Sequence, residues 1–345
     1  MKKLILALVL GIFILSPAFA KKNFVSYTEA FDVFEIMDHV SGWHPNSRKE
    51  YFKYFDKTFK MNHSDRLMLK TYRKIREKYH VVYPNAENSI FSEETISNDV
   101  ISSAFIGEST VDRAISILRK KKRVKDADLK ELVKVYRHFK PQVSKIVREG
   151  RLLIDEAKRL NKILKKQKII SNIKKLDKFF DLPTHRIKNG RIKLVWWPKT
   201  SAPIVDFRAG RVILRMNPIK HAELIDEEFI TYTLVDSLIV SLSKNKKENL
   251  SKVFKDGCPQ IKSKGLKLTD WFEAPLIDSL SRYYLPKLTA RKKFNPYIVK
   301  GQTPWREVFS KYLFGLSQYS IKRKAKFDRE FVTISANYCS QLLSI

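Results

Sequence analysis

Cysteine and glycine are scarce in this chain, whose 345 residues include two cysteines and ten glycines. Two cysteines cannot form a disulfide scaffold, so a hydrophobic core has to stabilise the fold. The sequence contains no G-x-x-x-x-G-K-[ST], G-x-G-x-x-G, G-x-S-x-G or C-x-x-C motif. The motif-level signatures of P-loop, dinucleotide-binding, serine-hydrolase and thiol-redox sites are therefore absent.

Histidine pairs with metal-binding spacing are also absent. None of the seven histidines lies four residues from another, so no helix presents two imidazoles on one face for a zinc ion. His39 and His44 lie five residues apart across a predicted turn and could approach each other, but loop histidines are usually solvated. We therefore predict no metal site and no cofactor.

Acidic residues are few beside the basic ones. The chain has 68 Lys and Arg against 36 Asp and Glu, a formal net charge of +32. The excess is largest between residues 101 and 200, with 28 basic and 10 acidic residues. This charge favours anionic partners: lipid head groups, lipopolysaccharide, acidic wall polymers, acidic proteins or nucleic acid. The alternative is an organism whose exported proteins are all lysine-rich, because net charge indicates non-specific binding more than one function.

Long apolar runs are absent after the first twenty residues. Lys2 and Lys3 precede an uncharged apolar run, Leu4–Leu15, and Ala18-Phe19-Ala20 has the small-x-small pattern of a signal-peptidase site. We expect a signal peptide cleaved after Ala20 and a secreted or periplasmic mature protein with no membrane span; an uncleaved anchor is the alternative. In an oxidising compartment Cys258 and Cys339 could pair, and two separate buried thiols are an equal alternative.

What is present favours a folded, mainly helical α+β chain. Hydrophobic residues make up 43% and aromatic residues 12%, enough for a core. In residues 21–180, helical periodicity and capping residues predict a series of helices. These helices cover Tyr27–Val40, Ser47–Phe59, Ser64–Tyr79, Glu93–Phe105, Thr110–Lys122, Asp126–Lys140, which Pro141 ends, and Gln142–Phe180, with Gly150 as its weak point. In the first helix acidic residues are interleaved with the apolar ones, and Val81–Ser92 is predicted as a loop.

The pattern changes at Leu182-Pro183, and residues 181–345 form the predicted α+β region. Two hairpins, His185–Trp197 turning at Asn189-Gly190 and Ile204–Met216 turning at Ala209-Gly210, predict a small antiparallel sheet. A helix from Asp226 to Leu242 is apolar nearly all round, as is typical of a buried central helix. Further helices are predicted from Pro275 to before Pro286, over Pro304–Leu316 and over Phe327–Leu343.

This order of a long helix, a hairpin-rich sheet, a buried helix and a second helix with acids resembles the catalytic half of secreted bacterial zincin-like metallopeptidases of the gluzincin type. The resemblance is architectural and covers residues 163–285, and Glu29–Tyr79 with Ser41-Gly42-Trp43 resembles their helical lead-in. In that family the buried helix carries H-E-x-x-H: its histidines bind zinc, its glutamate activates water, and a later glutamate is the third protein ligand.

The sequence departs from that motif where the chemistry resides. If Asp236 matches the family's glutamate, Val235 and Ile239 stand in the histidine positions, and neither binds metal. Glu273 or Asp278 matches the third ligand, so the resemblance implies a degenerate, catalytically inactive relative. The alternative is that no kinship exists and that Asp236 is a buried acid paired with Tyr232 or with a basic residue from another element.

Three further features are candidate binding sites. The basic run from Arg119 to Arg123 with Lys125 and the stretch Lys162–Lys168 are typical of polyanion-binding patches, and equally of solvated helix surfaces. Trp196 and Trp197 lie beside Lys199 at a strand end, where an exposed ring could stack on sugars or head groups, although such pairs are more often packed. The residues predicted to bind are Arg119, Lys120, Lys121, Lys122, Arg123, Lys125, Lys162, Lys165, Lys166, Lys168, Trp196 and Trp197.

The sequence thus predicts an exported, non-catalytic envelope protein that binds an anionic component or partner through a basic face. One alternative is an active hydrolase that uses Asp236 with Glu273 or Asp278 as paired carboxylates. Another is a structural partner of a second secreted protein, which co-purification with one protein would indicate.

Overall fold

The structure is a computed structural model that describes residues 23–45, 47–79, 99–166, 168–182, 191–199, 202–208, 211–220, 224–285 and 303–344. The predicted signal peptide, the loop Val81–Ser92, the turns at 189–190 and 209–210, and His80, His185 and His221 lie outside the described residues.

The described residues form an α+β fold that is mostly helical, as predicted. Its first group of helices is α2 (Glu29–Ser41), α3 (Lys49–Phe59), α4 (His63–Tyr79), α6 (Val100–Phe105), α7 (Val111–Lys121), α8 (Asp126–Gly150), α9 (Leu152–Lys166) and α10 (Ile169–Phe179). The second is α11 (Glu227–Val240), α12 (Lys244–Gly257), α13 (Gln260–Ser263), the π-helical η3 (Thr269–Glu273), α14 (Ala274–Asp278), the π-helical η4 (Ser279–Tyr284), α16 (Pro304–Lys322) and α17 (Arg329–Ser344).

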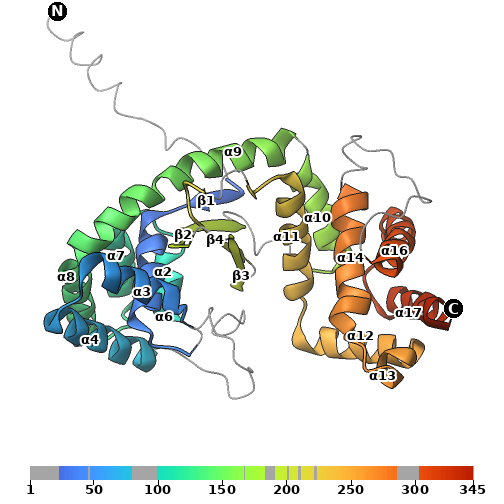
Figure 1. Cartoon of the computed structure of the whole chain (residues 1–345), viewed down its shortest axis with the longest axis horizontal. Helices are drawn as coiled ribbons and strands as arrows, with labels where there is room; N and C mark the ends of the chain where they lie inside the picture. The colour runs from blue at the N-terminus through green and yellow to red at the C-terminus, as the bar shows by residue number, and fades with distance from the viewer. Residues whose placement is uncertain are drawn as a thin grey trace, which may run out of the picture.

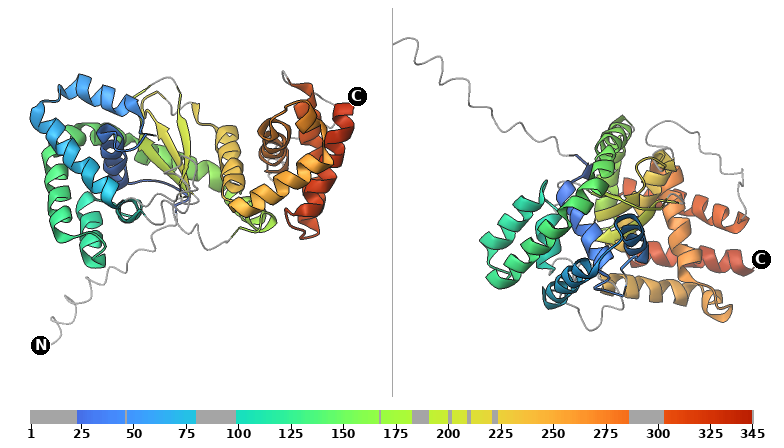
Figure 2. Two further views of the ribbon diagram at one scale, coloured as in Figure 1. Left: turned by 90° about the horizontal axis from the view of Figure 1, so that it is seen from below. Right: turned by 60° about the vertical axis from the view of Figure 1, so that its left-hand side comes forward.

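A four-stranded mixed sheet lies between the two helical groups (Figures 1 and 2). Its strands are β1 (Val25–Tyr27), β2 (Ile192–Trp196), β3 (Ile204–Arg208) and β4 (Arg211–Met216), in the order β1-β2-β4-β3. The predicted hairpin of β3 and β4 is confirmed, because these two strands pair antiparallel. The prediction of an antiparallel sheet is wrong for the other two pairings: β2 is parallel to β1 and to β4, and parallel neighbours need long crossover connections.

The sheet also spans the predicted boundary at residue 180. β1 belongs to the first region and β2 to the second, yet Val25 is the register partner of Ile192. Helices α8 and α9 pack on β2, and α11 contacts β3 and β4 from the second group (Figure 1). The regions 21–180 and 181–345 therefore share one core.

Helix α8 corrects a predicted boundary. Pro141 was expected to end a helix, but α8 continues through this exposed residue to Gly150. A proline on the solvent side of a helix can be tolerated, because its missing N–H and its ring affect the turn before it rather than the packed face. The predicted helix 142–180 is instead divided twice, at Gly150 and at Lys168, which adopts the left-handed conformation with φ 53°.

A disulfide joins the two cysteines. Cys258 follows α12, Cys339 lies on α17, and their Cα atoms are 5.8 Å apart. Both residues are fully buried, and α12 packs along α17. Of the two alternatives drawn from the sequence, the structure therefore contains the disulfide.

Candidate functional site

The basic run from Arg119 to Lys125, here named the basic corner, turns from α7 into α8. All six of its basic side chains are exposed, whereas Val124 between them is buried. Lys122 ends α7 in the left-handed conformation, and Lys125 is the N-cap residue of α8. Among the described residues none of the six forms an ion pair, so their charge faces solvent.

The second predicted patch lies at the far end of α9, which follows α8 in the chain. Lys162, Lys165, Lys166 and Lys168 are exposed and have no ion-pair partner in the described part of the chain. Helices α8 and α9 contain 25 and 15 residues. At 1.5 Å per residue the path from the basic corner to this patch is roughly 60 Å, so the structure does not bring the two together.

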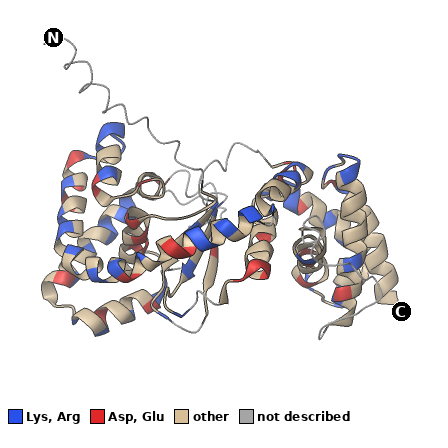
Figure 3. Cartoon of the chain, turned by 90° about the horizontal axis from the view of Figure 1, so that it is seen from above, with Lys and Arg blue, Asp and Glu red and all other residues tan. Residues whose placement is uncertain are grey.

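A row of basic residues on α8 lies between the two patches. Figure 3 shows basic residues recurring along the helices of the first group. On α8 these residues are exposed and lie within one side of the helix, because most of them are three or four residues apart. The row consists of Lys130, Lys134, Arg137, Lys140, Lys145 and Arg148. Of these, Lys134 is paired with Glu131.

Trp196 and Trp197 are both buried, each 1% exposed. The Trp196 ring packs edge-on against Tyr51 and Tyr54, and Trp197 packs edge-on against Tyr51. The strand alternation that suggested one exposed ring fails because both faces of the strand end are covered. Of the two alternatives the packed one holds, and neither ring is available for a ligand.

Asp236 and Glu273, the weak catalytic candidates, lie near each other. Asp236 is half-buried on α11; burial and the charge of Glu273 raise its pKa to about 6, while Lys247 opposes this rise. Burial also raises the pKa of Glu273. Val235 and Ile239, in the positions of the family's zinc ligands, are buried apolar residues. The basic neighbour expected for Asp236 is thus Lys247 of α12.

Asp278 does not join this pair. It is 4% exposed and accepts a hydrogen bond from Arg306 Nε at 2.6 Å, with Arg282 Nε at 3.6 Å. Burial raises the pKa of Tyr232, and among its charged neighbours Asp278 and Arg306 affect this pKa more than Asp236 does. Asp278 is therefore neutralised by arginines. Among the described residues no group of three or more His, Cys, Asp and Glu side chains is placed to hold a metal ion.

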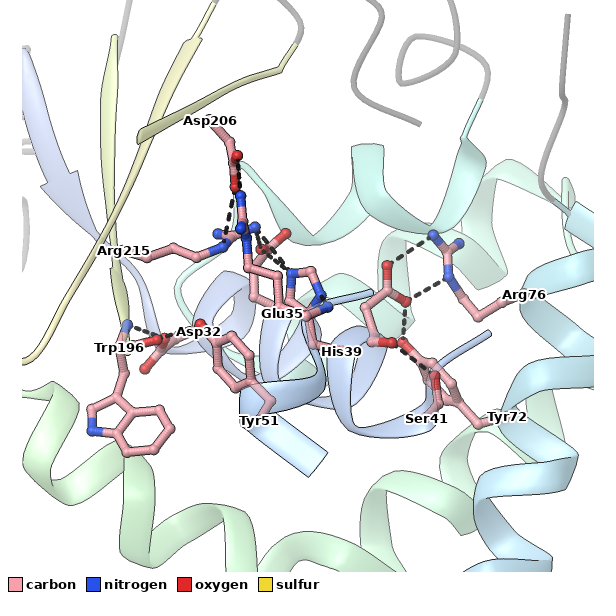
Figure 4. Close-up of polar contacts among 12 residues, drawn as sticks. Asp32, Glu35, His39, Ser41, Tyr51, Tyr72, Arg76, Trp196, Asp206 and Arg215 are labelled. Carbon is pink, nitrogen blue, oxygen red and sulfur yellow. Dashed lines mark hydrogen bonds and ion pairs between the residues drawn. The ribbon is translucent and has the colours of Figure 1, made fainter. Parts of the chain in front are cut away.

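The largest cluster of charged groups lies elsewhere, on α2, and the sequence reasoning did not identify it. Asp32, Glu35, Asp38 and His39 are all buried, since packed elements surround this helix (Figure 4). A signal was present: no Lys or Arg occurs between residues 23 and 47, in a chain with 68 of them. A stretch without basic residues in such a chain indicates a helix that lacks a solvated face.

Glu35 occupies the centre of this cluster. Its carboxylate lies 2.6 Å from Arg215 Nη2, and neither side chain is exposed. Arg215 also pairs with Asp206 of β3, which Arg48 reaches from the partly exposed side. His39 accepts the backbone N–H of Arg48 at Nδ1 over 3.0 Å, so that nitrogen carries no proton. The charges compensate one another and join α2 to the sheet.

Asp38 and Asp32 continue the network along α2. Asp38 receives two hydrogen bonds from Arg76, of 2.7 and 3.2 Å, and one from Tyr72 Oη of 2.9 Å, although burial still raises its pKa. Among the described residues no arginine forms an ion pair with Asp32, although the charge of Arg215 acts on it. It accepts the N–H of Trp196 at 2.8 Å and the hydroxyl of Tyr27 at 2.9 Å, and burial raises its pKa to about 7.

Gly150 shows how closely α8 approaches Asp32. A Cβ atom at Gly150 would lie 2.7 Å from Asp32 Oδ2 and 2.8 Å from Tyr27 Oη. Only glycine leaves room for this contact. Helix α2 packs against α3, α4, α8 and β2, and we interpret its buried cluster as structural.

No helix among the described residues is both long and apolar enough to cross a membrane. No family model, no curated protein and no solved structure matched the chain. A proposal for the function therefore rests on the exposed cations of α7–α9 and on the Asp236–Glu273 pair.

Proposed function

We propose that this chain is an exported, non-catalytic protein that binds an anionic component of the cell envelope. The observation that carries this proposal is the basic corner, whose six exposed cations have no ion-pair partner in the described part of the chain. Internal ion pairs would mark a structural role, whereas uncompensated charge attracts a polyanion over a Debye length of about 8 Å. The row on α8 extends this surface toward Lys162–Lys168.

Export is supported by two independent features. The first twenty residues have the n-region, apolar run and A-x-A site of a signal peptide. The buried disulfide between Cys258 and Cys339 is a bond that persists in oxidising compartments and is rare in the cytosol. Fractionation with N-terminal sequencing tests this part: a mature chain that begins at Lys21 outside the cytoplasm is expected.

A degenerate zincin-like core is part of the same proposal. Its support is the order in which buried α11 packs against α14 and η4, together with apolar residues in both histidine positions. Metal analysis of the purified protein should find no stoichiometric zinc, and zinc should not raise the midpoint of thermal unfolding. Stoichiometric zinc with a raised midpoint would reject this reading and require an enzyme assay.

Binding is tested by salt-dependent titration with vesicles of anionic phospholipid and with an acidic polysaccharide. Charge reversal by Arg119→Glu, Lys121→Glu and Arg123→Glu together should weaken binding at least tenfold at low salt and flatten its salt dependence. The matched control reverses exposed lysines of the second helical group, Lys252→Glu, Lys255→Glu and Lys262→Glu, with the same change in net charge. Equal loss in both triple variants would mean non-specific attraction, and unchanged affinity in the first would exclude the basic corner.

A second candidate is a hydrolase that uses Asp236 and Glu273, and one observation favours it. The two carboxyls are half-buried and near enough for Glu273 to raise the pKa of Asp236. Such pairs, in which one acid keeps its proton longer, occur at acid–base sites. Hydrolysis of a peptide library that Asp236→Asn and Glu273→Gln each abolish would support this candidate. Activity that survives both substitutions would not.

A further inference from the structure

The exposed side of α8 is cationic over most of its length. Between residues 130 and 148 eight side chains of this helix are exposed, and six of them are Lys or Arg. The other two are Pro141 and Ser144. The partly exposed Glu131 pairs with Lys134. The six cations, here named the α8 row, are Lys130, Lys134, Arg137, Lys140, Lys145 and Arg148.

The opposite side of α8 is fixed in the core. Leu132, Val135, Phe139 and Val143 are buried there, and α8 packs against α2, α4 and α7. The α8 row is therefore held on a rigid support. At 1.5 Å per residue it is about 27 Å long, so its six cations lie about 5 Å apart, close to one for each helical turn.

This anchoring argues against insertion of α8 into a bilayer. A helix that lies in a membrane interface buries its apolar face among the lipid chains. The apolar face of α8 is already packed in the core, and none of the eight exposed side chains is a large apolar one. The α8 row therefore favours a ligand that stays in water.

The charge spacing argues for one class of polymer. Duplex DNA carries one negative charge per about 1.7 Å of its axis, about three times the density of the α8 row. Proteins that bind single-stranded nucleic acid stack its bases on aromatic rings, and the eight exposed side chains include none. A linear polysaccharide with one acidic group on each sugar has its charges about one sugar length apart, roughly the 5 Å of the row.

We propose that the α8 row binds a linear acidic polysaccharide that carries one carboxylate on each sugar and lies along the helix axis. Lysine ammonium and arginine guanidinium groups donate charge-assisted hydrogen bonds to carboxylates. Pro141 and Ser144 are short, so the polymer can approach the helix between the cations. The inference rests on the proposed function, binding of an anionic envelope component, and adds the chemical class and the direction of the bound chain.

The test is calorimetric titration of the full mature protein with oligogalacturonates of increasing length, which carry a carboxylate on every sugar. Affinity should rise up to about six sugars, one for each cation, and little beyond that length. With the hexamer, the logarithm of the binding constant should fall against the logarithm of salt concentration with a slope of about −4. A hyaluronate fragment of equal length, with a carboxylate on every second sugar, should bind about tenfold more weakly.

Variants locate the binding on the α8 row. Arg137→Glu with Arg148→Glu should weaken hexamer binding at least tenfold. The matched control, Lys252→Glu with Lys255→Glu on α12, makes the same change in net charge at exposed residues and should retain affinity within about twofold. Lys130→Gln with Lys140→Gln is a second probe that adds no negative charge and should weaken binding about fivefold. Circular dichroism checks that each variant is folded.

Two results would overturn the α8 row without touching the proposed function. One is equal affinity for the galacturonate and hyaluronate fragments. The other is a row variant that binds the hexamer as the α12 control does, while long polyanions still bind through the basic corner. Anionic vesicles that bind more tightly than the hexamer, with loss in the row variant, would assign the row to a membrane and reject the polysaccharide. Absence of binding to every anionic probe would reject both proposals.

Discussion

Arg215 on β4 and Glu35 on α2 form an ion pair of 2.6 Å in which neither side chain is exposed to solvent. The pair connects the first helix of the described chain to the last strand of the sheet. Burying two charges is costly, so the energetic weight of this contact shows when one partner is removed.

Arg215→Met should lower the free energy of unfolding by about 3 to 5 kcal/mol, because the buried Glu35 loses its arginine and keeps the weaker contact with His39 Nε2 at 3.6 Å. The double variant Glu35→Met with Arg215→Met should recover most of this loss, since Asp206 keeps Arg48 as a partner. Urea unfolding measures both. The matched control is Arg66→Met, whose ion pair with Asp56 is exposed and should contribute less than about 1 kcal/mol. A double variant as unstable as the single one would contradict the paired-charge account.

Asp32 should make stability depend on pH. Burial raises its pKa from 3.8 to about 7 in the folded state, so between these values the folded chain binds more protons than the unfolded chain. The contribution of the protonated Asp32 carboxyl to the free energy of unfolding is fully present below about pH 4 and is lost as the pH rises to about 7. Asp32→Asn should remove this loss, and the variant should be the more stable protein at pH 8.

Unfolding at a series of pH values, with each variant compared with the natural chain, measures the contribution of Asp32. Asp236→Asn is a useful companion, since its carboxyl has a pKa raised to about 6 and should act over a narrower range. Asp256→Asn removes one exposed carboxyl and serves as the control. If Asp32→Asn parallels the natural chain from pH 4 to 8, Asp32 does not titrate as inferred.

Gly150→Ala should destabilise the fold by about 1 to 3 kcal/mol, because the new Cβ would lie 2.7 Å from Asp32 and 2.8 Å from Tyr27. Gly315→Ala in α16 is the matched control: nothing lies within 4 Å of its Cβ position. There the substitution should stabilise by about 0.5 to 1 kcal/mol through helix propensity. If α8 approaches α2 this closely, Gly150→Ala should lower the midpoint of thermal unfolding and Gly315→Ala should raise it.

Reduction of the disulfide should weaken the second helical group. The bond closes a loop with a sequence separation of 81 residues, for which chain entropy predicts a contribution of roughly 4 kcal/mol. Cys258→Ala with Cys339→Ala should show that loss in urea. Thiol labelling of the unfolded natural protein should detect no free thiol when the protein is isolated from outside the cytoplasm, and two when it is expressed in the reducing cytosol.

Local sequence patterns predicted much of the fold. Caps and apolar spacing located most helices, and the turn chemistry around residues 209–210 predicted the pairing of β3 with β4. The parallel pairing of β1 with β2 could not be predicted, because a three-residue strand has almost no sequence signal and its partner follows only after eight described helices. Likewise, the sequence of α2 does not show which distant arginines form ion pairs with Asp38 and Glu35.

The candidate sites also differ in whether the local sequence could predict their exposure. Exposed lysines could be located from composition alone, as at Arg119 to Lys125. Trp196 and Trp197 could not, because their burial depends on α3 packing over the strand end.

The position of β1 in the sheet has a consequence for the order of folding. Its hydrogen-bonding neighbour β2 begins at Ile192, and the cation that neutralises Glu35 comes at residue 215. Helix α2 therefore gains its partners on β2 and β4 only after most of the polypeptide between them has been synthesised. Contacts between such distant residues slow folding, since a long loop has to close before any contact is gained.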